Sequence, residues 1–591
     1  MSLNSDPQFQ VRRRQLVVLF AVLVLCLPII FRLVDFQVVR AADLNQEALQ
    51  RRSIPVTIYG TRGNIYDADG KVMASSVMRY NITSSPRFAT ESFKRVSDEG
   101  VRETVSRDQA ITELAEVTGV SAESIREALN KNPESDFAFL AQNVDVEVLR
   151  AVQNLAIPWV YSEQTPARTY PNGAVAGNLI GFMSKDGPGA GIELLLNETC
   201  LAPQNGTETY ERGLDGVRIP GSTVVTEQVK NGADVQLTIS SDLQWYAQEA
   251  LAAGAQDARA EWATAIVIEV ETGKIRAVAE YPTADSNNPG ATHPDTWTSR
   301  SFTSPYEPGS TMKTLTLAAA MSEGAITSTT GVTVPWRVNF GNDIVIGDSF
   351  QHGDTKWTAA GVMAQSSNIG TIFLSQNIPS SVRYDYMVKT GFGSKTGVNF
   401  LGESRGIFNG PGKWDKHTEL ATNYGQGISV TAMQMAASYQ VIGNDGKKIP
   451  LSLVEGCSWE DGTVTDTPDL SGTEQVFTPA AAQAAQDLLE TTVNSSWLEP
   501  QLSIAGYRVG AKTGTAQVAE NGRYGDKAVT SIIGMVPMDN PKYVVAVTLG
   551  YPVNKSTRAV APIFRDIMTQ VLKTYKIEPS TEPVVKLPTT W

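Results

Sequence analysis

The stretch Pro305–Met321, PYEPGSTMKTLTLAAAM, places a hydroxyl and an amine one helical turn apart at the start of an apolar helix. Pro308 and Gly309 indicate a turn, so Ser310 falls in the first turn of the helix, where unpaired N–H groups and the positive dipole end favour a developing anion. Residues three apart share a helix face, so the amine of Lys313, if neutral, can take the hydroxyl proton. Burial and a second nearby cation are the means of lowering a lysine pKa. By itself the pattern is weak, because a capping serine followed by a solvated lysine is the commoner reason for this spacing.

Two later motifs supply the other groups that such a site needs. They are MAQSSNIGT at residues 363–371, which contains Ser366, Ser367 and Asn368, and GAKTGTA at residues 510–516, which contains Lys512, Thr513, Gly514 and Thr515. The ordered trio SxxK, SDN and KTG is the signature of serine enzymes that recognise penicillin. A match to all three in this order is improbable by chance, so the three patches are predicted to fold into one pocket.

The residues around these motifs resemble the class B penicillin-binding proteins, in particular the division-specific FtsI type. The stretches that carry the resemblance are YEPGSTMK, SSN, KTGTAQ, GESRG (402–406), ATNYGQGISVTAMQMA (421–436), TRGNIYDADGKVMASS (61–76), RTYPNGAVAGNLIGF (168–182) and GAGIE (189–193). Together with an N-terminal apolar segment they extend from about residue 12 to residue 575. Ser367 stands where the signature has aspartate, which favours class B proteins over class A β-lactamases.

The resemblance implies an α+β, multidomain fold. It consists of a single N-terminal transmembrane helix, an elongated pedestal of mixed structure, and a C-terminal transpeptidase domain, similar to serine β-lactamases, with an antiparallel sheet and helices. The expected boundaries are residues 1–15 for a cytoplasmic tail, 16–38 for the anchor, 39–225 for the pedestal, 226–575 for the transpeptidase domain and 576–591 for a flexible tail.

Local patterns in the sequence predict parts of this fold directly. Alternating apolar residues predict two strands joined by a Thr-Gly turn at 264–282, and three later strands at 507–517, 530–537 and 542–551. Helical patterns occur at 107–119, 121–132 and 562–575. Ser106 or Asp108 is expected to begin the first helix, and Ser121 with Glu123 the second. Strands at both ends of the C-terminal region with helices between them favour an antiparallel sheet covered by helices.

The resemblance also assigns roles to the residues of the first two motifs. Ser310 is expected to be the acylated nucleophile and Lys313 its proton acceptor. Ser366 would relay a proton to the leaving amine, and Asn368 would bind either the side chain of the acyl donor or Lys313. From the residues alone, the choice between Ser366 and Lys313 as the base stays open.

The third motif is expected to bind the substrate. By the resemblance, Lys512 supplies positive potential that attracts a terminal carboxylate and lowers the pKa of the neighbouring lysine. The hydroxyls of Thr513 and Thr515 bind that carboxylate, and Gly514 lies between them in the substrate-binding strand. The oxyanion hole is expected to be the backbone N–H groups of Ser310 and Thr515.

A β-lactamase would need a further carboxylate to activate water for deacylation. The segment ELATN, Glu419–Asn423, superficially matches the E-x-x-x-N pattern of such enzymes. It lacks leucine before the asparagine, however, and continues directly into the family's ATNYGQGISVT stretch. We therefore expect Glu419 to be a structural carboxylate.

The implied activity is that of a peptidoglycan D,D-transpeptidase, acting through an acyl-enzyme on Ser310 in septal wall synthesis. Expected partners are stem peptides ending in D-Ala-D-Ala, β-lactams as covalent inhibitors, an FtsW-like septal glycan polymerase, other divisome proteins and the cytoplasmic membrane. No metal or organic cofactor is expected. The alternatives are an elongation-type transpeptidase of the same class and a β-lactam-binding scaffold or sensor without turnover.

The N-terminus predicts a membrane anchor. Arg12, Arg13 and Arg14 precede an uninterrupted apolar run from Leu16 to Phe31. This run is longer than the apolar core of a signal peptide, which favours an uncleaved anchor. The arginines are expected to keep the N-terminus in the cytoplasm, which places the catalytic domain outside.

Composition excludes several other classes of protein. The 591 residues carry a net charge of −13, so a nucleic-acid binder is not expected. The three histidines, His293, His352 and His417, are isolated and do not predict a metal site. Cys200 and Cys457 are the one conceivable disulfide pair, since Cys26 lies in the apolar run, but their places in different expected domains argue against pairing.

Several residues outside the motifs are expected to be structural. Arg62, Gly63 and Glu193 are predicted to hold the pedestal together near its neck, and Asp215 with Gly216 to help close it. Trp336 and Trp357 lie between the first two motifs, where an aromatic residue could line a groove. For both tryptophans, ordinary packing is the favoured interpretation.

Overall fold

The computed structural model describes residues 7–44, 47, 53–96, 100–211, 219–520 and 523–591. Its contacts divide the chain into two compact units, Met1–Gly60 with Pro203–Lys230, and Thr61–Ala202 with Asn231–Trp591. This division does not coincide with the expected boundary between residues 225 and 226, because strands from both sides of that boundary share one sheet in the second unit.

The first unit contains the N-terminal helix and a small sheet. Helix α1 (Pro7–Val34) continues into a π-helical turn, η1 (Asp35–Val39), and residues Val11–Val39 are long and apolar enough to cross a membrane. The expected anchor, residues 16–38, lies within this range. The sheet consists of β1 (Ser53–Ile58), β10 (Gly206–Glu211) and β11 (Val224–Glu227), which are antiparallel. Asp215 and Gly216 lie outside the described residues, so their expected role stays a prediction.

Residues 61–202 of the second unit form a mixed α/β region. Its elements are β2 (Ile65–Tyr66), β3 (Val72–Ser84), β4 (Ser92–Val96), β5 (Arg102–Ser106), α3 (Arg107–Thr118), α4 (Ala122–Lys131), β6 (Ala138–Val144), α5 (Val146–Asn154), β7 (Val160–Thr169), α6 (Gly177–Ile180), β8 (Met183–Ser184), β9 (Gly187–Pro188), α7 (Gly191–Leu195) and η3 (Asn197–Leu201). Ser106 and Ser121 cap α3 and α4 by accepting hydrogen bonds from backbone N–H groups three residues on, as their positions predicted.

Residues 231–591 hold the larger share of the elements. They are β12 (Asp234–Leu237), α8 (Ser241–Ala258), β13 (Trp262–Glu269), β14 (Ile275–Tyr281), α9 (Arg300–Thr303), η6 (Gly309–Met312), α10 (Lys313–Ser322), β15 (Gly331–Val334), β16 (Arg337–Asn339), β17 (Val345–Gly347), β18 (Thr355–Thr358), α11 (Ala359–Ala364), α12 (Asn368–Ser375), α13 (Ser380–Thr390), α14 (Lys416–Ala421), α15 (Ala432–Gly443), β19 (Lys447–Lys448), β20 (Val454–Ser458), β21 (Val464–Thr465), β22 (Glu474–Gln475), α16 (Pro479–Asn494), α17 (Glu499–Leu502), β23 (Gly510–Glu520), β24 (Arg523–Val536), β25 (Tyr543–Gly550) and α18 (Val560–Thr574).

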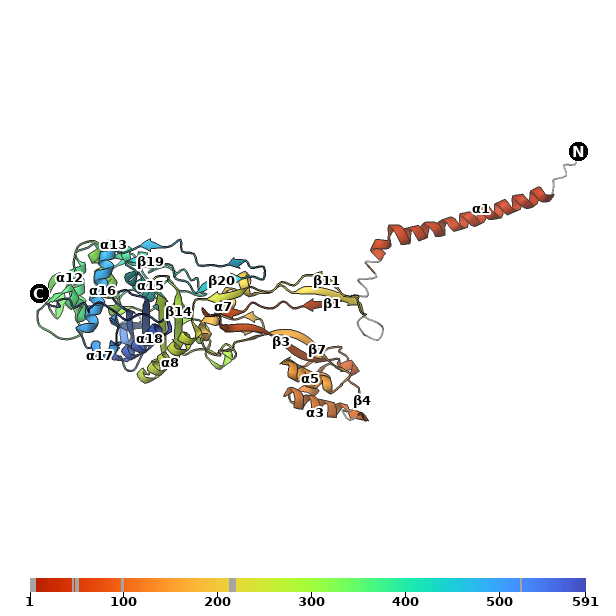
Figure 1. Cartoon of the computed structure of the whole chain (residues 1–591), viewed down its shortest axis with the longest axis horizontal. Coiled ribbons are helices and arrows are strands. Elements are labelled where there is room, and N and C mark those ends of the chain that lie inside the picture. Colours follow the sequence, from red (N-terminus) through yellow and green to blue (C-terminus); the bar gives the residue numbers. More distant parts are fainter. Residues whose placement is uncertain (1–6, 45–46, 48–52, 97–99, 212–218, 521–522) are drawn as a thin grey trace. The chain divides into compact units, whose positions relative to one another are not determined.

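The framework of this part is a five-stranded antiparallel sheet in the order β14-β13-β25-β24-β23. Its edge strand β14 lies beside α8 (Figure 1). Side chains alternate between its two faces, as they must in a pleated strand. Ile266 and Ile268 of β13 join the core shared with α10, α15 and α16, whereas Ala265 and Val267 join the core shared with α8 and α18. Both faces of the sheet are therefore covered by helices. The observed strands β13, β14, β23, β24 and β25 and the helix α18 confirm the predicted strands and closing helix. β23 is left at the edge of the sheet, open to the Ser310 turn.

A second sheet joins the region of residues 61–202 to later segments. Its order is β21-β20-β12-β2-β3-β6, with β7 also paired to β3. In this sheet Cys457 of β20 lies opposite Val235 of β12, and the N–H of Ala233 donates to the carbonyl of Cys200. Cys200 and Cys457 form a disulfide with their Cα atoms 6.0 Å apart. The expectation that they stay apart is wrong, because β12 pairs with β2 across the expected boundary and with β20 on its other side, which brings Cys457 to Cys200.

A buried ion network lies beside this sheet. The guanidinium groups of Arg62 and Arg168 each donate to the carboxylate of Glu193, at 2.7 and 2.6 Å, and Glu193 is fully buried. Arg168 also donates to the carbonyl of Gly63 at 2.8 Å. A β-carbon on Gly63 would lie 1.8 Å from the carbonyl oxygen of Ala233, so only glycine fits there. The expected structural role of Arg62, Gly63 and Glu193 is confirmed.

The segment 576–591, expected to be a flexible tail, is instead packed against the domain, and we call it the C-terminal strap. Leu587 packs against the core that contains α16. Its hydrogen bonds to the domain include Val585 N to Glu490 Oε2 (3.2 Å), Leu587 N to Thr491 Oγ1 (3.3 Å), Thr358 Oγ1 to Pro588 O (2.6 Å), Thr358 N to Thr589 O (3.2 Å) and Trp591 Nε1 to Val332 O (3.2 Å). Pro/Thr-rich composition suggested a loose segment, but an extended segment is ordered when its backbone groups find partners on neighbouring helices.

Candidate active site

Ser310 lies in η6, a 3₁₀ helix one turn long that leads into α10. The turn is held by Gly309, which has φ +58° and whose N–H donates to the carbonyl of Gly425 at 2.9 Å. A β-carbon on Gly425 would lie 2.2 Å from the carbonyl oxygen of Gly309, so the two backbones can meet only through glycine. Ser310 is thereby fixed at the wall of a cavity and is partly exposed.

Lys313 is fully buried at the start of α10, behind the cavity wall. Its Nζ donates to the carbonyl of Ser366 at 2.5 Å and lies 3.3 Å from the Ser366 hydroxyl. Among the described residues, no hydrogen bond joins Lys313 to Ser310. In enzymes without substrate, catalytic hydrogen bonds are often long and tighten only in the substrate complex. Lys313 therefore stays a candidate base, held in place by Ser366.

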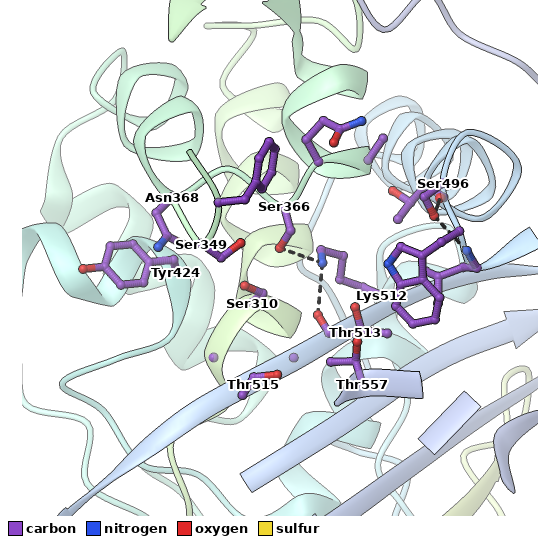
Figure 2. Close-up of a pocket in the computed structure, with 18 of the residues that line it drawn as sticks. Ser310, Ser349, Ser366, Asn368, Tyr424, Ser496, Lys512, Thr513, Thr515 and Thr557 are labelled. Atoms are coloured by element: carbon purple, nitrogen blue, oxygen red, sulfur yellow. Dashed lines mark hydrogen bonds between the residues drawn. The ribbon is translucent and has the colours of Figure 1, made fainter. Parts of the chain in front are cut away.

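Lys512 is the second amine in contact with Ser366. It extends from β23, and its Nζ donates to Ser366 Oγ at 2.9 Å and to the carbonyl of Thr513 at 3.0 Å (Figure 2). The hydroxyl of Ser366 thus lies between two amines. The three sequence-distant motifs meet at this hydroxyl, as predicted.

Burial disfavours the charge on both lysines, and repulsion from Lys512 adds to this effect at Lys313. Burial lowers the pKa of Lys512 to about 7. The pKa of Lys313 is lowered well below its ordinary value, first by burial and then by the positive charge of Lys512, while the negative charge of Asp348 acts in the opposite direction. A neutral amine at Lys313 near neutral pH is what proton abstraction from Ser310 requires.

The turn that carries Ser366 and Asn368 connects α11 to α12. Ser366 has φ +55°, a left-handed conformation that a non-glycine residue adopts only when its surroundings hold it there. Asn368 lines the cavity, but its side-chain amide donates to the carbonyl of Gly347 at 3.1 Å. No hydrogen bond from Asn368 to Lys313 is present among the described residues. Asn368 was expected to bind either Lys313 or the side chain of the acyl donor. Its side-chain oxygen therefore remains available for the acyl donor.

Sequence reasoning missed Asp348, which lies under this turn. Its buried carboxylate accepts hydrogen bonds from the hydroxyl of Ser367 and from the N–H groups of Asn368 and Ile369, at 2.6, 2.6 and 3.1 Å. Asp348 lies 18 positions before Ser366, across irregular sequence and short elements, so no local pattern marked it. A buried carboxylate at a helix N-terminus is visible only in the fold.

The substrate-binding strand β23 lies against the Ser310 turn. A β-carbon on Gly514 would lie 2.9 Å from the carbonyl oxygen of Pro308, and one on Gly309 would lie 2.9 Å from that of Thr515. The two backbones therefore run in contact, with glycine on each side. Thr513, Gly514 and Thr515 all line the cavity, as expected. This contact keeps the proposed oxyanion donors, the N–H groups of Ser310 and Thr515, on adjacent segments.

The cavity has a volume of about 600 Å³ and is lined by residues from η6, the turn between α11 and α12, α16 and β23. Its lining residues are Gly309, Ser310, Ser349, Phe350, Ala364, Gln365, Ser366, Asn368, Tyr424, Gln426, Thr492, Ser496, Trp497, Leu498, Lys512, Thr513, Gly514, Thr515 and Thr557. None of these described lining residues carries a carboxylate. Glu419 is not among them, and it pairs instead with Lys416 on α14 at 3.1 Å, in keeping with a structural role.

Aromatic residues of the cavity differ from those that the sequence suggested. Phe350 and Trp497 line it, whereas Trp357 is buried and packs against His352, with ring centres 4.8 Å apart. Trp336 stacks instead with the guanidinium of Arg337 at 4.3 Å. Packing is thus the role of both predicted tryptophans. Trp497 lies outside the three motifs, in the short stretch after α16, so its contribution to the groove followed only from the fold.

Comparison with known proteins agrees with this geometry. Residues 263–569 match the family described as the penicillin binding protein transpeptidase domain, and residues 57–237 match the penicillin-binding protein dimerisation domain. The chain is 30% identical to penicillin-binding protein PbpB of Mycolicibacterium smegmatis, over 98% of this chain and 92% of that protein. It is 28% identical to the peptidoglycan D,D-transpeptidase FtsI of Escherichia coli, over 93% of this chain and 89% of that one.

Solved structures show the same fold. A peptidoglycan synthetase from Bifidobacterium adolescentis matches with a TM-score of 0.72 and 28% identity, over 91% of this chain and all of that chain (100%). Penicillin binding protein 3 from Mycobacterium tuberculosis, complexed with aztreonam, matches with a TM-score of 0.68 and 24% identity, over 90% of this chain and 100% of that chain. The second likeness concerns the fold alone.

Proposed function

This chain belongs to the class B penicillin-binding proteins and is a serine-type peptidoglycan D,D-transpeptidase, and on that premise we propose that Ser310 forms its acyl-enzyme. The observation that carries the proposal is the hydroxyl of Ser366 between two buried amines, beside Ser310, in a cavity whose described lining has no carboxylate. This arrangement can activate a hydroxyl and protonate a leaving amine. The described lining offers no carboxylate to activate water for rapid hydrolysis of the acyl-enzyme, which argues against a β-lactamase.

In the acylation step, Ser310 Oγ attacks the carbonyl of the penultimate D-Ala of a stem peptide. The neutral amine of Lys313 takes the hydroxyl proton, and the N–H groups of Ser310 and Thr515 stabilise the oxyanion. As the C–N bond breaks, Ser366 passes a proton to the amine of the leaving D-Ala, since its hydroxyl contacts both lysines. The acyl group then remains on Ser310 as an ester.

Binding of the donor depends on the third motif. Lys512 attracts the terminal carboxylate, and the hydroxyls of Thr513 and Thr515 bind it. In the second step the amine of a neighbouring stem attacks the ester and loses a proton to Lys313. The bond from the acyl carbon to Ser310 Oγ breaks, and Oγ takes up a proton to restore the hydroxyl. A β-lactam takes the place of the donor in the first step, because its strained amide presents a carbonyl and a carboxylate to the same groups.

Labelling with a fluorescent penicillin tests the nucleophile. The full-length protein should be labelled in detergent, the Ser310→Ala variant should not, and the Ser304→Ala variant, changed in the same loop outside the cavity lining, should be labelled normally. Persistent labelling of Ser310→Ala, with an unfolding temperature close to that of the unaltered protein, would refute the assignment.

The cellular role and orientation are part of this proposal. Arginines 12–14 favour a cytoplasmic N-terminus, and the Cys200–Cys457 disulfide favours an oxidising extracytoplasmic compartment for the rest of the chain. The names PbpB and FtsI among the relatives support wall synthesis at the septum, with an FtsW-like glycan polymerase and divisome proteins as partners. Septal localisation of a fluorescent fusion is expected; localisation along the side wall would favour the elongation-type alternative.

The remaining alternative is a β-lactam-binding scaffold or sensor without turnover. The presence of all the reactive groups in one cavity favours turnover. Crosslinking of a purified lipid-linked substrate by the full-length protein distinguishes the two, since a sensor would take the penicillin label without forming crosslinks.

A further inference from the structure

The carboxylate of Asp348 holds the N-terminus of α12. It follows β17 directly and accepts from the Ser367 hydroxyl and from two backbone N–H groups, those of Asn368 and Ile369. The first N–H groups of a helix have no partners within the helix, and a carboxylate there is favoured by the helix dipole. The preceding carbonyl, that of Gly347, accepts from the Asn368 side chain. Residues 347–348 therefore bind three consecutive residues of the motif turn and its helix.

These hydrogen bonds to residues 347–348 determine where the Ser366 hydroxyl lies. On its other side the turn is held by α11, because Ser366 N donates to Met363 O at 3.1 Å and Ser367 N to Val362 O at 2.9 Å. Ser366 itself keeps the left-handed φ of +55°. A strained residue keeps its conformation only while both flanks are fixed. Without the contacts to Asp348, the flank at α12 would be released and the hydroxyl would leave its place between the two amines.

Asp348 is also the negative charge that faces the buried amines. Among the described residues, the charged groups that face Lys313 are Lys512 from β23 and Asp348. The other titratable group at Asp348 is His352, whose Nε2 lies 3.2 Å from Asp348 Oδ2. The carboxylate and Lys512 act on the charge of Lys313 in opposite directions. Burial and the charge of Lys512 thus favour the neutral amine of Lys313, and Asp348 favours the charged one.

We propose that Asp348 is a positioning residue for acylation: its carboxylate fixes the turn that carries Ser366 and supplies the negative charge opposite the paired amines, so it governs both the rate of acylation and its pH dependence. The inference rests on the proposed role of Ser310 as nucleophile and Lys313 as base. It adds a residue outside the three motifs, which acts through Ser366 and Lys313 and not on the substrate.

The second-order rate of acylation by a fluorescent penicillin, measured from about pH 5 to about pH 10 on the full-length protein, tests the proposal. Asp348→Asn keeps the shape and an oxygen for the two N–H groups but removes the charge. We expect the rise of the rate with pH to move to lower pH by about one unit, because Lys313 loses its proton more easily without the carboxylate. The maximal rate should fall on the order of 10-fold, through a less well-placed Ser366.

Two further variants serve as controls. Asp343→Asn removes the same charge from the exposed turn between β16 and β17, and its pH profile should coincide with that of the unaltered protein. Because the His352 imidazole contacts the same carboxylate, with Nε2 3.2 Å from Asp348 Oδ2, the shift is also measured in a His352→Gln background, where it should persist. A shift that disappears in that background would assign the effect to the imidazole and overturn the proposal.

An unchanged pH profile in Asp348→Asn would overturn the proposal, whether or not the rate falls, since a purely structural residue would lower the rate at every pH alike. If Asp348→Asn does not fold, Asp348→Glu replaces it: the charge remains but is displaced, so the maximal rate should fall while the pH profile stays in place. A Glu variant with the full rate would equally overturn the proposal. Labelling of Ser310→Ala is read separately, so failure of the proposed nucleophile is distinguishable from failure of this inference.

Discussion

Gly514→Ala tests the contact between β23 and the Ser310 turn. The added methyl carbon would lie 2.8 Å from Ser531 Oγ, which can rotate away, and 2.9 Å from the carbonyl oxygen of Pro308, which is backbone. An ordinary contact begins at 3.4 Å, so strand and turn must separate by about 0.5 Å. That separation opens the space between Ser310 and Thr515, whose N–H groups form the proposed oxyanion hole. A displacement of about 1 Å costs about 100-fold in rate, so half of it costs about 10-fold, or about 1.4 kcal/mol of transition-state stabilisation.

The assay is the second-order acylation rate with a fluorescent penicillin, together with the thermal unfolding temperature. We expect the rate of Gly514→Ala to fall about 10-fold, with a modest loss of stability from overpacking, about 1–3 kcal/mol. Gly412→Ala is the matched control, because a β-carbon at Gly412 meets no atom within 4 Å. If Gly514→Ala is acylated as fast as Gly412→Ala, the strand does not need this approach to the turn, and the reasoning is refuted.

Two further predictions concern the amine pair and the disulfide. Lys512→Ala should move the rise of acylation with pH to higher pH, because loss of the second cation raises the pKa of Lys313; a shift to lower pH, or one shared by the exposed-site control Lys395→Ala, would contradict this. Cys457→Ser should destabilise the protein by roughly 2–5 kcal/mol, since the disulfide closes a loop between residues 257 apart. Thermal unfolding measures this, Cys26→Ser in α1 is the control, and equal unfolding temperatures with and without reductant would contradict it.

The residues of the three motifs could be predicted because each motif is local. A serine and a lysine three apart at a helix start, or a Lys-Thr-Gly within a strand, already specify which side chains point together. The alternating strands around Ile266 and in β23–β25 were predictable for the same reason. What the sequence left open was contact between segments: Lys313 bonds to Ser366 and not to Ser310, and Asn368 bonds to Gly347.

The errors and omissions share one physical cause, which is that long-range pairing has no local pattern. Cys200 and Cys457 meet because β12 and β20 add to a sheet built by earlier strands, and nothing near either cysteine indicates this. Asp348 resembles any loop aspartate until the N-terminus of α12 is placed over it. The C-terminal strap was misjudged from composition, which reports on the tendency of a segment to fold alone and not on the partners available to it.

The C-terminal strap supports the helix that leads into the active site. Thr589 crosses α11 where a β-carbon on Gly361 would lie 1.9 Å from its carbonyl oxygen, so no side chain separates the two backbones. α11 leads directly into Ser366, and its cap, Thr358, is bonded to the strap. A change that displaced the strap would remove both hydrogen bonds from Thr358 and loosen the start of the helix that leads into Ser366, at a place outside the residues that line the cavity.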